Sequence, residues 1–98
     1  MQSLKHKKTI NKIFSDGKRI FNKSPYPLII STIDSDIKGI VICISKKNFK
    51  KAVDRNKVKR YVREGLKGKT AEKAIAIIYN SNKLPDKALI DQVSNLTF

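Results

Sequence analysis

The sequence predicts an α+β fold, a two-layer sandwich in which about three helices pack against a mixed four-stranded sheet. Isoleucine-rich runs typical of strands alternate along the chain with segments that have the longer period of helices. Two strands joined through a helix predict a βαβ crossover within one sheet. The 98 residues, 40% of them hydrophobic, suffice for one domain with a modest core, which we take to span residues 1–98.

The first elements are short. Residues 9–16 are predicted to form a helix that Thr9 caps and Gly17 ends, with Ile10, Ile13 and Phe14 on one apolar face. A short strand is expected over residues 18–21. Longer strands over residues 26–33 and 39–45 follow, joined by a polar turn.

The central helix is predicted over residues 53–66, and its two faces differ in chemistry. Four apolar side chains share the arc that should pack on the sheet: Val58, Tyr61, Val62 and Leu66. The opposite arc carries a polar and basic stripe at i, i+3, i+4 and i+7: Asn56, Lys59, Arg60 and Arg63. A buried strand over residues 74–79 and a last helix opened by Pro85 and Asp86 complete the fold.

The charge of the chain points to a polyanionic partner, with nucleic acid as the first candidate. The net charge is +14, and residues 1–63 hold 17 of the 22 Lys and Arg residues. Three of the four arginines, Arg55, Arg60 and Arg63, lie within nine residues, and a guanidinium can grip phosphate with two hydrogen bonds. The alternative is a solvated helix face. Such a face usually mixes charges, because like charges at i, i+4 destabilise a helix by about 0.2–0.5 kcal/mol per pair.

Catalytic and metal-binding constellations are absent from the sequence. The only histidine, His6, lies in the basic segment 1–8, which we expect to be a flexible arm. Cys43 lies in an apolar run that predicts a buried core thiol, and there is no Gly-rich phosphate loop. We therefore expect no catalytic residue, no metal site and no cofactor bound by the protein itself. No apolar run reaches the roughly 18–20 residues of a membrane span, and the start does not read as a signal peptide. A cytoplasmic protein with no membrane partner is expected.

The central helix also resembles the signature helix of the bacterial ribonuclease P protein subunit. The matching pattern is Arg55-Asn56-x-x-Lys59-Arg60-x-x-Arg63-Glu64, preceded by Ala52-Val53. Further matches are Ser45-Lys46-Lys47 before this helix, Leu4-Lys5 with Ile10, Ile13-Phe14 and Gly17 at the start, and the strand from Ile75 to Tyr79. The resemblance therefore covers most of the chain.

This resemblance implies a fold with a left-handed βαβ crossover and a role in a holoenzyme. The protein would bind the catalytic RNA and the 5′ leader of precursor tRNA, while the RNA, using Mg²⁺, cuts the phosphodiester bond. No DNA partner is expected. The implied RNA-binding residues are Lys46, Lys47, Arg55, Asn56, Lys57, Lys59, Arg60 and Arg63. A cleft between the first helix and the sheet would take the leader with Ile10, Lys12, Phe14, Lys18, Ile29 and Ile30.

Two residues depart from the family pattern, and two other functions compete. Lys57 replaces a common arginine, and Ile10 replaces a common phenylalanine, so aromatic stacking in the cleft would depend on Phe14. Phe21 is the other candidate for stacking on an unpaired base, with core packing as its alternative. Core packing of Phe14 is the equal alternative. A structural RNA-binding protein of ribosomal type would share the charge without leader binding. A DNA-reading helix is the second rival, and the apolar arc of the central helix argues against it.

Overall fold

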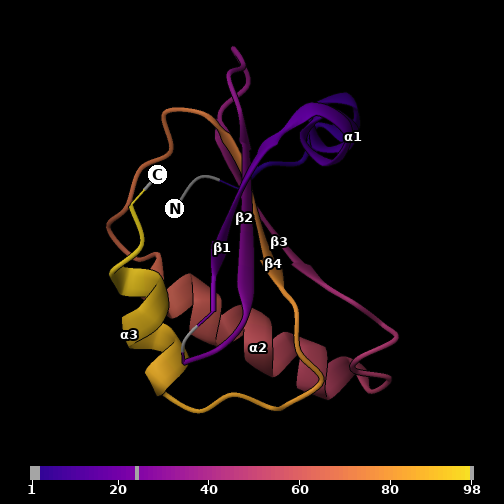
Figure 1. Ribbon diagram of the computed structural model, residues 1–98, viewed down its shortest axis with the longest axis vertical. Helices are drawn as coiled ribbons and strands as arrows, with labels where there is room; N and C mark the ends of the chain where they lie inside the picture. The colour runs from indigo at the N-terminus through magenta and orange to yellow at the C-terminus, as the bar shows by residue number, and fades with distance from the viewer. Residues whose placement is uncertain (1–2, 24, 98) are drawn as a thin grey trace.

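The structure is a computed structural model that describes residues 3–23 and 25–97 (Figure 1). Its helices are α1 (Lys7–Asp16), α2 (Ala52–Gly65) and α3 (Ala88–Ser94). Its strands are β1 (Lys18–Asn22), β2 (Leu28–Ile33), β3 (Gly39–Ile44) and β4 (Ala74–Tyr79). The predicted α+β class, with three helices and a mixed four-stranded sheet, is confirmed.

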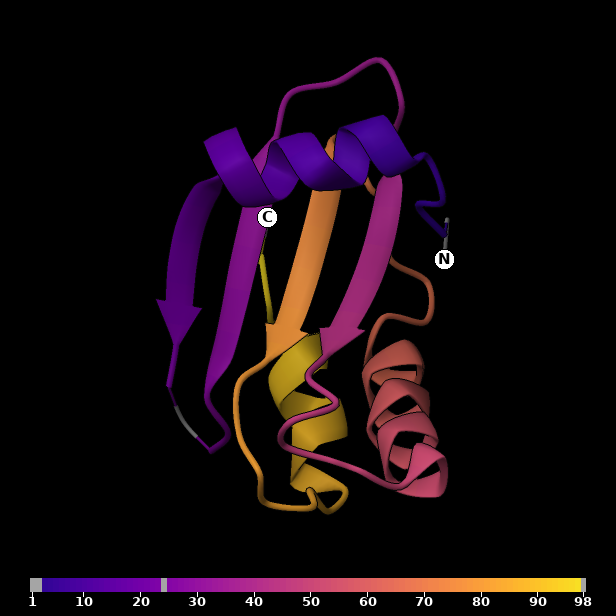
Figure 2. The ribbon, with the colours of Figure 1, turned by 90° about the vertical axis from the view of Figure 1, so that its right-hand side faces the viewer.

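The strand order is β1-β2-β4-β3, and only the last pair is parallel. From β3 the chain passes through α2, on the side of the sheet away from the viewer in Figure 2, and returns as the neighbouring strand β4. This path has the left-handed sense that the resemblance implied.

The two faces of the sheet are covered unequally. Helices α2 and α3 lie on one face, whereas α1 crosses only one end of the other (Figures 1 and 2). Because side chains alternate along a strand, Leu28 and Ile30 face α2 and α3, while Ile29 and Ser31 point to the side of α1. We call these the closed face and the open face.

The main core fills the closed face. Val58, Val62 and Leu66 are fully buried there and Tyr61 packs at the edge, as the apolar arc predicted. Gly65 ends α2 and lies against α3. A Cβ at Gly65 would come within 2.7 Å of the Ile90 carbonyl oxygen, so the close approach of the two helices depends on glycine.

The first helix begins two residues earlier than predicted. Its N-cap is His6, whose Nδ1 accepts a hydrogen bond from the backbone N–H of Thr9 at 3.4 Å. Thr9 therefore lies in the first turn, where its side chain is buried. Gly17 ends α1 as expected, and its N–H donates to the carbonyl of Ile13.

The last helix begins later than predicted, at Ala88. Asp86 lies in the turn before it and accepts two hydrogen bonds through Oδ1, from the N–H of Ala88 and the hydroxyl of Tyr26, both at 2.9 Å. Both bonds lower the pKa of the Asp86 carboxyl, and the bond from Ala88 has the larger effect. The Asp86 side chain thus binds the backbone in a turn where the sequence predicted the first turn of the helix. Aspartate next to proline typically favours such a turn.

The N-terminal arm predicted over residues 1–8 lies, in its described part, against the edge of the sheet. Ser3 forms a parallel bridge with Ile40, and the N–H of Leu4 donates to the Ile40 carbonyl at 2.9 Å. The Leu4 side chain is buried against Ile13 and Ala74. One apolar residue in a basic segment was enough to anchor it. Residues 1 and 2 lie outside the described residues.

Candidate nucleic-acid interface

The outer surface of α2 carries the predicted basic stripe. Asn56, Arg60 and Arg63 are exposed, and Lys57 and Lys59 are half-buried. An open hollow of about 680 Å³ runs along this surface and is lined by residues that include Asn56, Lys57, Arg60 and Arg63. Ion pairs between described residues join Glu64 to Lys67 and Asp34 to Lys73, so none involves the stripe. The stripe cations are therefore available to an external anion.

Arg55 has a different environment from the other two arginines of the segment. Its Nη1 donates to the carbonyls of Phe49 and Lys50, at 2.7 and 3.0 Å. These bonds tie the start of α2 to the preceding loop, whose Phe49 is buried in the core. Arg55 thus has a structural role whatever else it binds. The prediction that it binds RNA stays a prediction.

Lys46 and Lys47 lie in the turn after β3 and are exposed. The Ser45 hydroxyl oxygen accepts the N–H of Lys47 at 3.1 Å, which fixes the backbone of this turn. The turn therefore offers two lysines beside the N-terminal end of α2, as the sequence suggested.

A row of apolar side chains crosses the open face where α1 leaves it uncovered. The strand register aligns four residues, one from each strand: Phe21, Ile29, Ile78 and Cys43. Phe21 is 61% exposed, and the other three are partly exposed. An exposed apolar row at the centre of a sheet is suited to the faces of unpaired bases.

Phe14 and Ile10 lie on α1, the helix that crosses one end of this face (Figure 2). They lie four residues apart, on the flank of α1 opposite to Lys8 and Lys12. Phe14 is 37% exposed, so it does not fill the core as its alternative reading required; Ile13 does. Arg19, at the same face on β1, donates from Nη2 to the Phe14 carbonyl at 3.1 Å.

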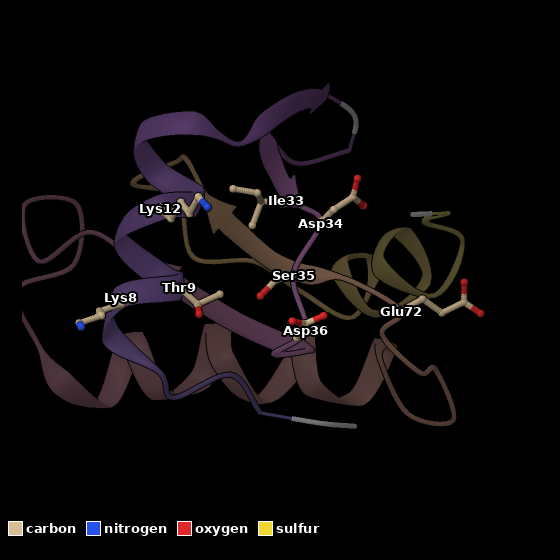
Figure 3. Close-up of a pocket in the computed structure, with 8 residues that line it drawn as sticks. All are labelled: Lys8, Thr9, Lys12, Ile33, Asp34, Ser35, Asp36 and Glu72. Atoms are coloured by element: carbon tan, nitrogen blue, oxygen red, sulfur yellow. The ribbon is translucent and has the colours of Figure 1, made fainter.

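Three predicted leader residues lie elsewhere. Ile30 points to the closed face and is only 3% exposed, because its neighbour Ile29 takes the open face. Lys18 pairs with Thr32, and alternation turns it to the side of Ile30. Lys12 lines a hollow on the other flank of α1, shared with Asp34, Asp36 and Glu72 (Figure 3). The structure therefore places these three residues away from the apolar row, and leader binding by them stays a prediction.

Sequence reasoning missed three residues of the open face. Arg19, Ile78 and Cys43 belong to it, and alternation counted back along β1 from Phe21 would have found the first of them. Cys43 is partly exposed, not the buried core thiol that was expected, because α1 leaves its part of the face uncovered. Burial of its sulfur still raises the pKa of the Cys43 thiol, and the nearby Lys59 ammonium partly opposes this.

Within residues 3–23 and 25–97, no group of three or more His, Cys, Asp or Glu side chains is arranged to hold a metal ion. None of the helices in this described part is both long and apolar enough to cross a bilayer.

A mixed sheet with one open apolar row, beside a helix whose free face is cationic, defines a small RNA-binding protein of α+β type. The chain belongs to the ribonuclease P protein family, because the family model for ribonuclease P matches residues 1–96. Membership makes it a tRNA-processing protein, part of an endoribonuclease holoenzyme and a partner of ribonuclease P RNA.

Solved structures agree with this assignment. The Staphylococcus aureus RNase P protein is 25% identical, with a TM-score of 0.76 over 96% of this chain and 89% of that one. A second structure of the S. aureus protein is 27% identical, with a TM-score of 0.64 over 96% and 80% of the two chains. The Thermotoga maritima RNase P protein shares the fold at 23% identity, with a TM-score of 0.64 over 99% and 84%. No curated protein matches the chain.

Proposed function

We propose that this chain binds the catalytic RNA of ribonuclease P through the outer surface of α2 and the 5′ leader of precursor tRNA on its open sheet face. The observation that carries the proposal is the presence of two surfaces of different chemistry on different sides of one small domain. One is cationic and rigid, and the other is apolar with basic edges.

The surface of α2 suits structured RNA. Within residues 3–23 and 25–97 the guanidinium groups of Arg60 and Arg63 donate no hydrogen bond, whereas those of Arg19 and Arg55 each donate to backbone carbonyls. Their guanidinium groups can therefore each offer several N–H donors to phosphate oxygens. Since α2 is held by a fully buried face, these donors are presented with little loss of backbone entropy on binding.

The open face suits an unpaired strand. Phe14 and Phe21 supply rings on which bases can stack, and Ile29 and Ile78 continue the apolar floor from Phe21 across the sheet. Arg19 can meet a phosphate at the rim, since its bond to the Phe14 carbonyl uses only one of its nitrogens. Stacking of this kind tolerates any base, which suits leaders of varied sequence.

The proposal assigns bond cleavage to the RNA subunit and its Mg²⁺, and none of it to the protein. The basic surface would lower the concentration of Mg²⁺ that the RNA needs, because it relieves repulsion between phosphates. The protein would bind no cofactor of its own.

The test is reconstitution with a bacterial ribonuclease P RNA at low Mg²⁺. Added protein should raise cleavage of precursor tRNA, and protein without RNA should leave the substrate intact. The holoenzyme should also bind precursor tRNA more tightly than mature tRNA. Robust cleavage by the RNA-free protein would contradict the assignment of catalysis. Binding of ribonuclease P RNA without any preference for a leader would instead favour a purely structural RNA-binding role.

A further inference from the structure

The docked N-terminal segment adds a basic residue to the surface of α2. Leu4 anchors the segment on the outer edge of β3, where its side chain is 4% exposed. Gly39 makes the approach possible: its φ is +149°, and a Cβ there would come within 3.1 Å of the Leu4 Cα and backbone nitrogen. The segment therefore has a defined position relative to α2.

Lys5 follows the anchor and lines the same hollow as Lys59 and Arg63. This hollow is about 220 Å³ in volume and lies at the edge of β3. No acidic side chain lines it, and neither ion pair of the described residues involves its three cations. Three positive charges from two separate segments thus converge without a counter-charge.

The edge of β3 contributes a backbone donor to the hollow. The Ile40 carbonyl points outward to accept the N–H of Leu4, so the backbone N–H of Ile42, two residues on, points to the same edge. An amide donor beside lysine and arginine is the usual composition of a phosphate-binding site.

Two other hollows, beside α1 and on the other flank of α2, have a different charge balance. Beside α1, Lys8 and Lys12 share their hollow with three acidic residues (Figure 3). On the other flank of α2, the hollow that contains Arg60 also contains Asp54 and Glu64. Among these three hollows, the edge of β3 is the one with cations alone.

We propose that Lys5, Lys59 and Arg63 form one phosphate subsite for RNA at the edge of β3, and that Leu4 is the positioning residue that holds Lys5 there. This inference rests on the proposed RNA-binding function of α2. RNA is favoured over an acidic peptide because the exposed cations continue along α2 beyond the hollow, as a sugar-phosphate backbone would require.

The first experiment measures binding to ribonuclease P RNA at fixed, low salt. Lys5→Ala should weaken binding about 5- to 10-fold, as for loss of one charge-assisted contact to phosphate. Lys8→Ala is the matched control, because it removes one lysine of the same N-terminal region that faces acidic residues. It should change affinity by less than about 2-fold. Equal effects of the two variants would mean that only total charge matters, and would overturn the subsite.

A double-mutant cycle tests whether the cations share one phosphate. The losses of RNA affinity caused by Lys5→Ala and Arg63→Ala should be non-additive. The double variant should bind RNA more tightly than the product of the two single losses predicts. Lys5→Ala and Arg60→Ala should be additive, because Arg60 lines the other flank of α2. Additivity in both cycles would overturn the proposal without touching the function of α2.

The role of Leu4 is tested by a variant that keeps every charge. Leu4→Ala should reproduce the loss of RNA affinity seen for Lys5→Ala, and the double variant should bind no worse than either single one. Leu4→Met, which keeps an apolar anchor, should restore affinity. A Leu4→Ala protein that remains folded by circular dichroism and binds RNA normally would exclude the positioning role. If Leu4→Ala does not fold, the cycle of Lys5 and Arg63 decides the subsite.

The outcomes separate this inference from the function on which it rests. If Arg60→Ala and Arg63→Ala leave RNA affinity unchanged, the α2 interface itself is wrong. If they weaken binding while Lys5→Ala does not, only the subsite is wrong. Oligo-aspartate serves as a second probe: binding that depends on Lys5, with no effect of Lys5→Ala on RNA affinity, would assign the edge of β3 to an acidic peptide instead.

Discussion

The closed and open faces of the sheet are built from the same strands and almost the same residue types, yet their side chains differ in exposure. On β4, Ile77 is fully buried under α2 and α3, while the next residue, Ile78, lies in the partly exposed row. The difference arises only from what covers each face. An isoleucine-rich strand therefore does not by itself indicate a core, because a helix that crosses only one end of a sheet leaves apolar residues free for a ligand.

The largest expected difference between the faces is in stability. Ile77→Ala should lower the free energy of unfolding by about 2–5 kcal/mol, since it opens a cavity in the main core. Ile78→Ala, the matched control, should lower it by about 1 kcal/mol or less, because its side chain is already partly in water. Urea unfolding of both variants measures the two values. Equal losses would show that the open face is packed as tightly as the core.

Substitutions on the outer surface of α2 should weaken binding to RNA and leave the stability of the fold unchanged. Arg60→Ala should weaken binding to ribonuclease P RNA by about 1.5–3 kcal/mol, as for a hydrogen-bonded charge. Arg60→Lys should recover only part of the loss if the contact is bidentate. For Arg60→Ala, the slope of log K against the logarithm of the salt concentration should also become shallower, by somewhat under one unit. Unchanged affinity, or loss of helix content by circular dichroism, would contradict this description of the surface.

The open face should discriminate between substrates with and without a leader. Phe21→Ala and Phe14→Ala should each narrow the affinity gap between precursor and mature tRNA by about 1–3 kcal/mol for each base that stacks. Binding of mature tRNA by the holoenzyme should hardly change. Ile20→Ala is the control, because Ile20 is also exposed on β1 but points to the other side of the sheet. An equal effect of Ile20→Ala would remove the distinction between the two sides.

The smallest effect is expected at the turn before α3, on the closed side. The pKa of Asp86 is lowered by the N–H of Ala88 and the hydroxyl of Tyr26, so the folded state favours the carboxylate. Its contribution is therefore present above the ordinary aspartate pKa of about 3.9 and is lost as pH falls through the lower folded value. Asp86→Asn should flatten the acid limb of a stability curve measured between about pH 5 and pH 2. An unaltered acid limb would show that the carboxylate is not stabilised in the fold.

Much of the fold could be predicted because it depends on local patterns. The alternation of β3 and the two arcs of α2 follow from the geometry of strands and helices, and the structure matches both. Gly17 correctly predicted where α1 ends, and the end of α2 at Gly65 lies one residue before the predicted bound. The cap of α1 was misplaced because His6 competes with Thr9 for the same role, and propensity favours the threonine.

The candidate site was predictable on α2 and less so on the open face. A stripe on one helix has fixed internal geometry, so Asn56, Lys59, Arg60 and Arg63 could be grouped from spacing alone. The open face combines residues from four strands, and its membership depends on register. A shift of one residue exchanges Ile29 for Ile30, which is why both were predicted and only one points to that face.

The sequence by itself determined the class of the fold, the net charge and the basic face of α2, because each is a property of composition or of short-range periodicity. Tertiary structure alone decided that Leu4 docks on β3, that Lys5 reaches Lys59 and Arg63, and that Lys12 faces Asp34 and Asp36. These relations join residues distant in sequence. They follow from how α1 crosses the sheet and how the strands pair, and both depend on the packing of the whole domain.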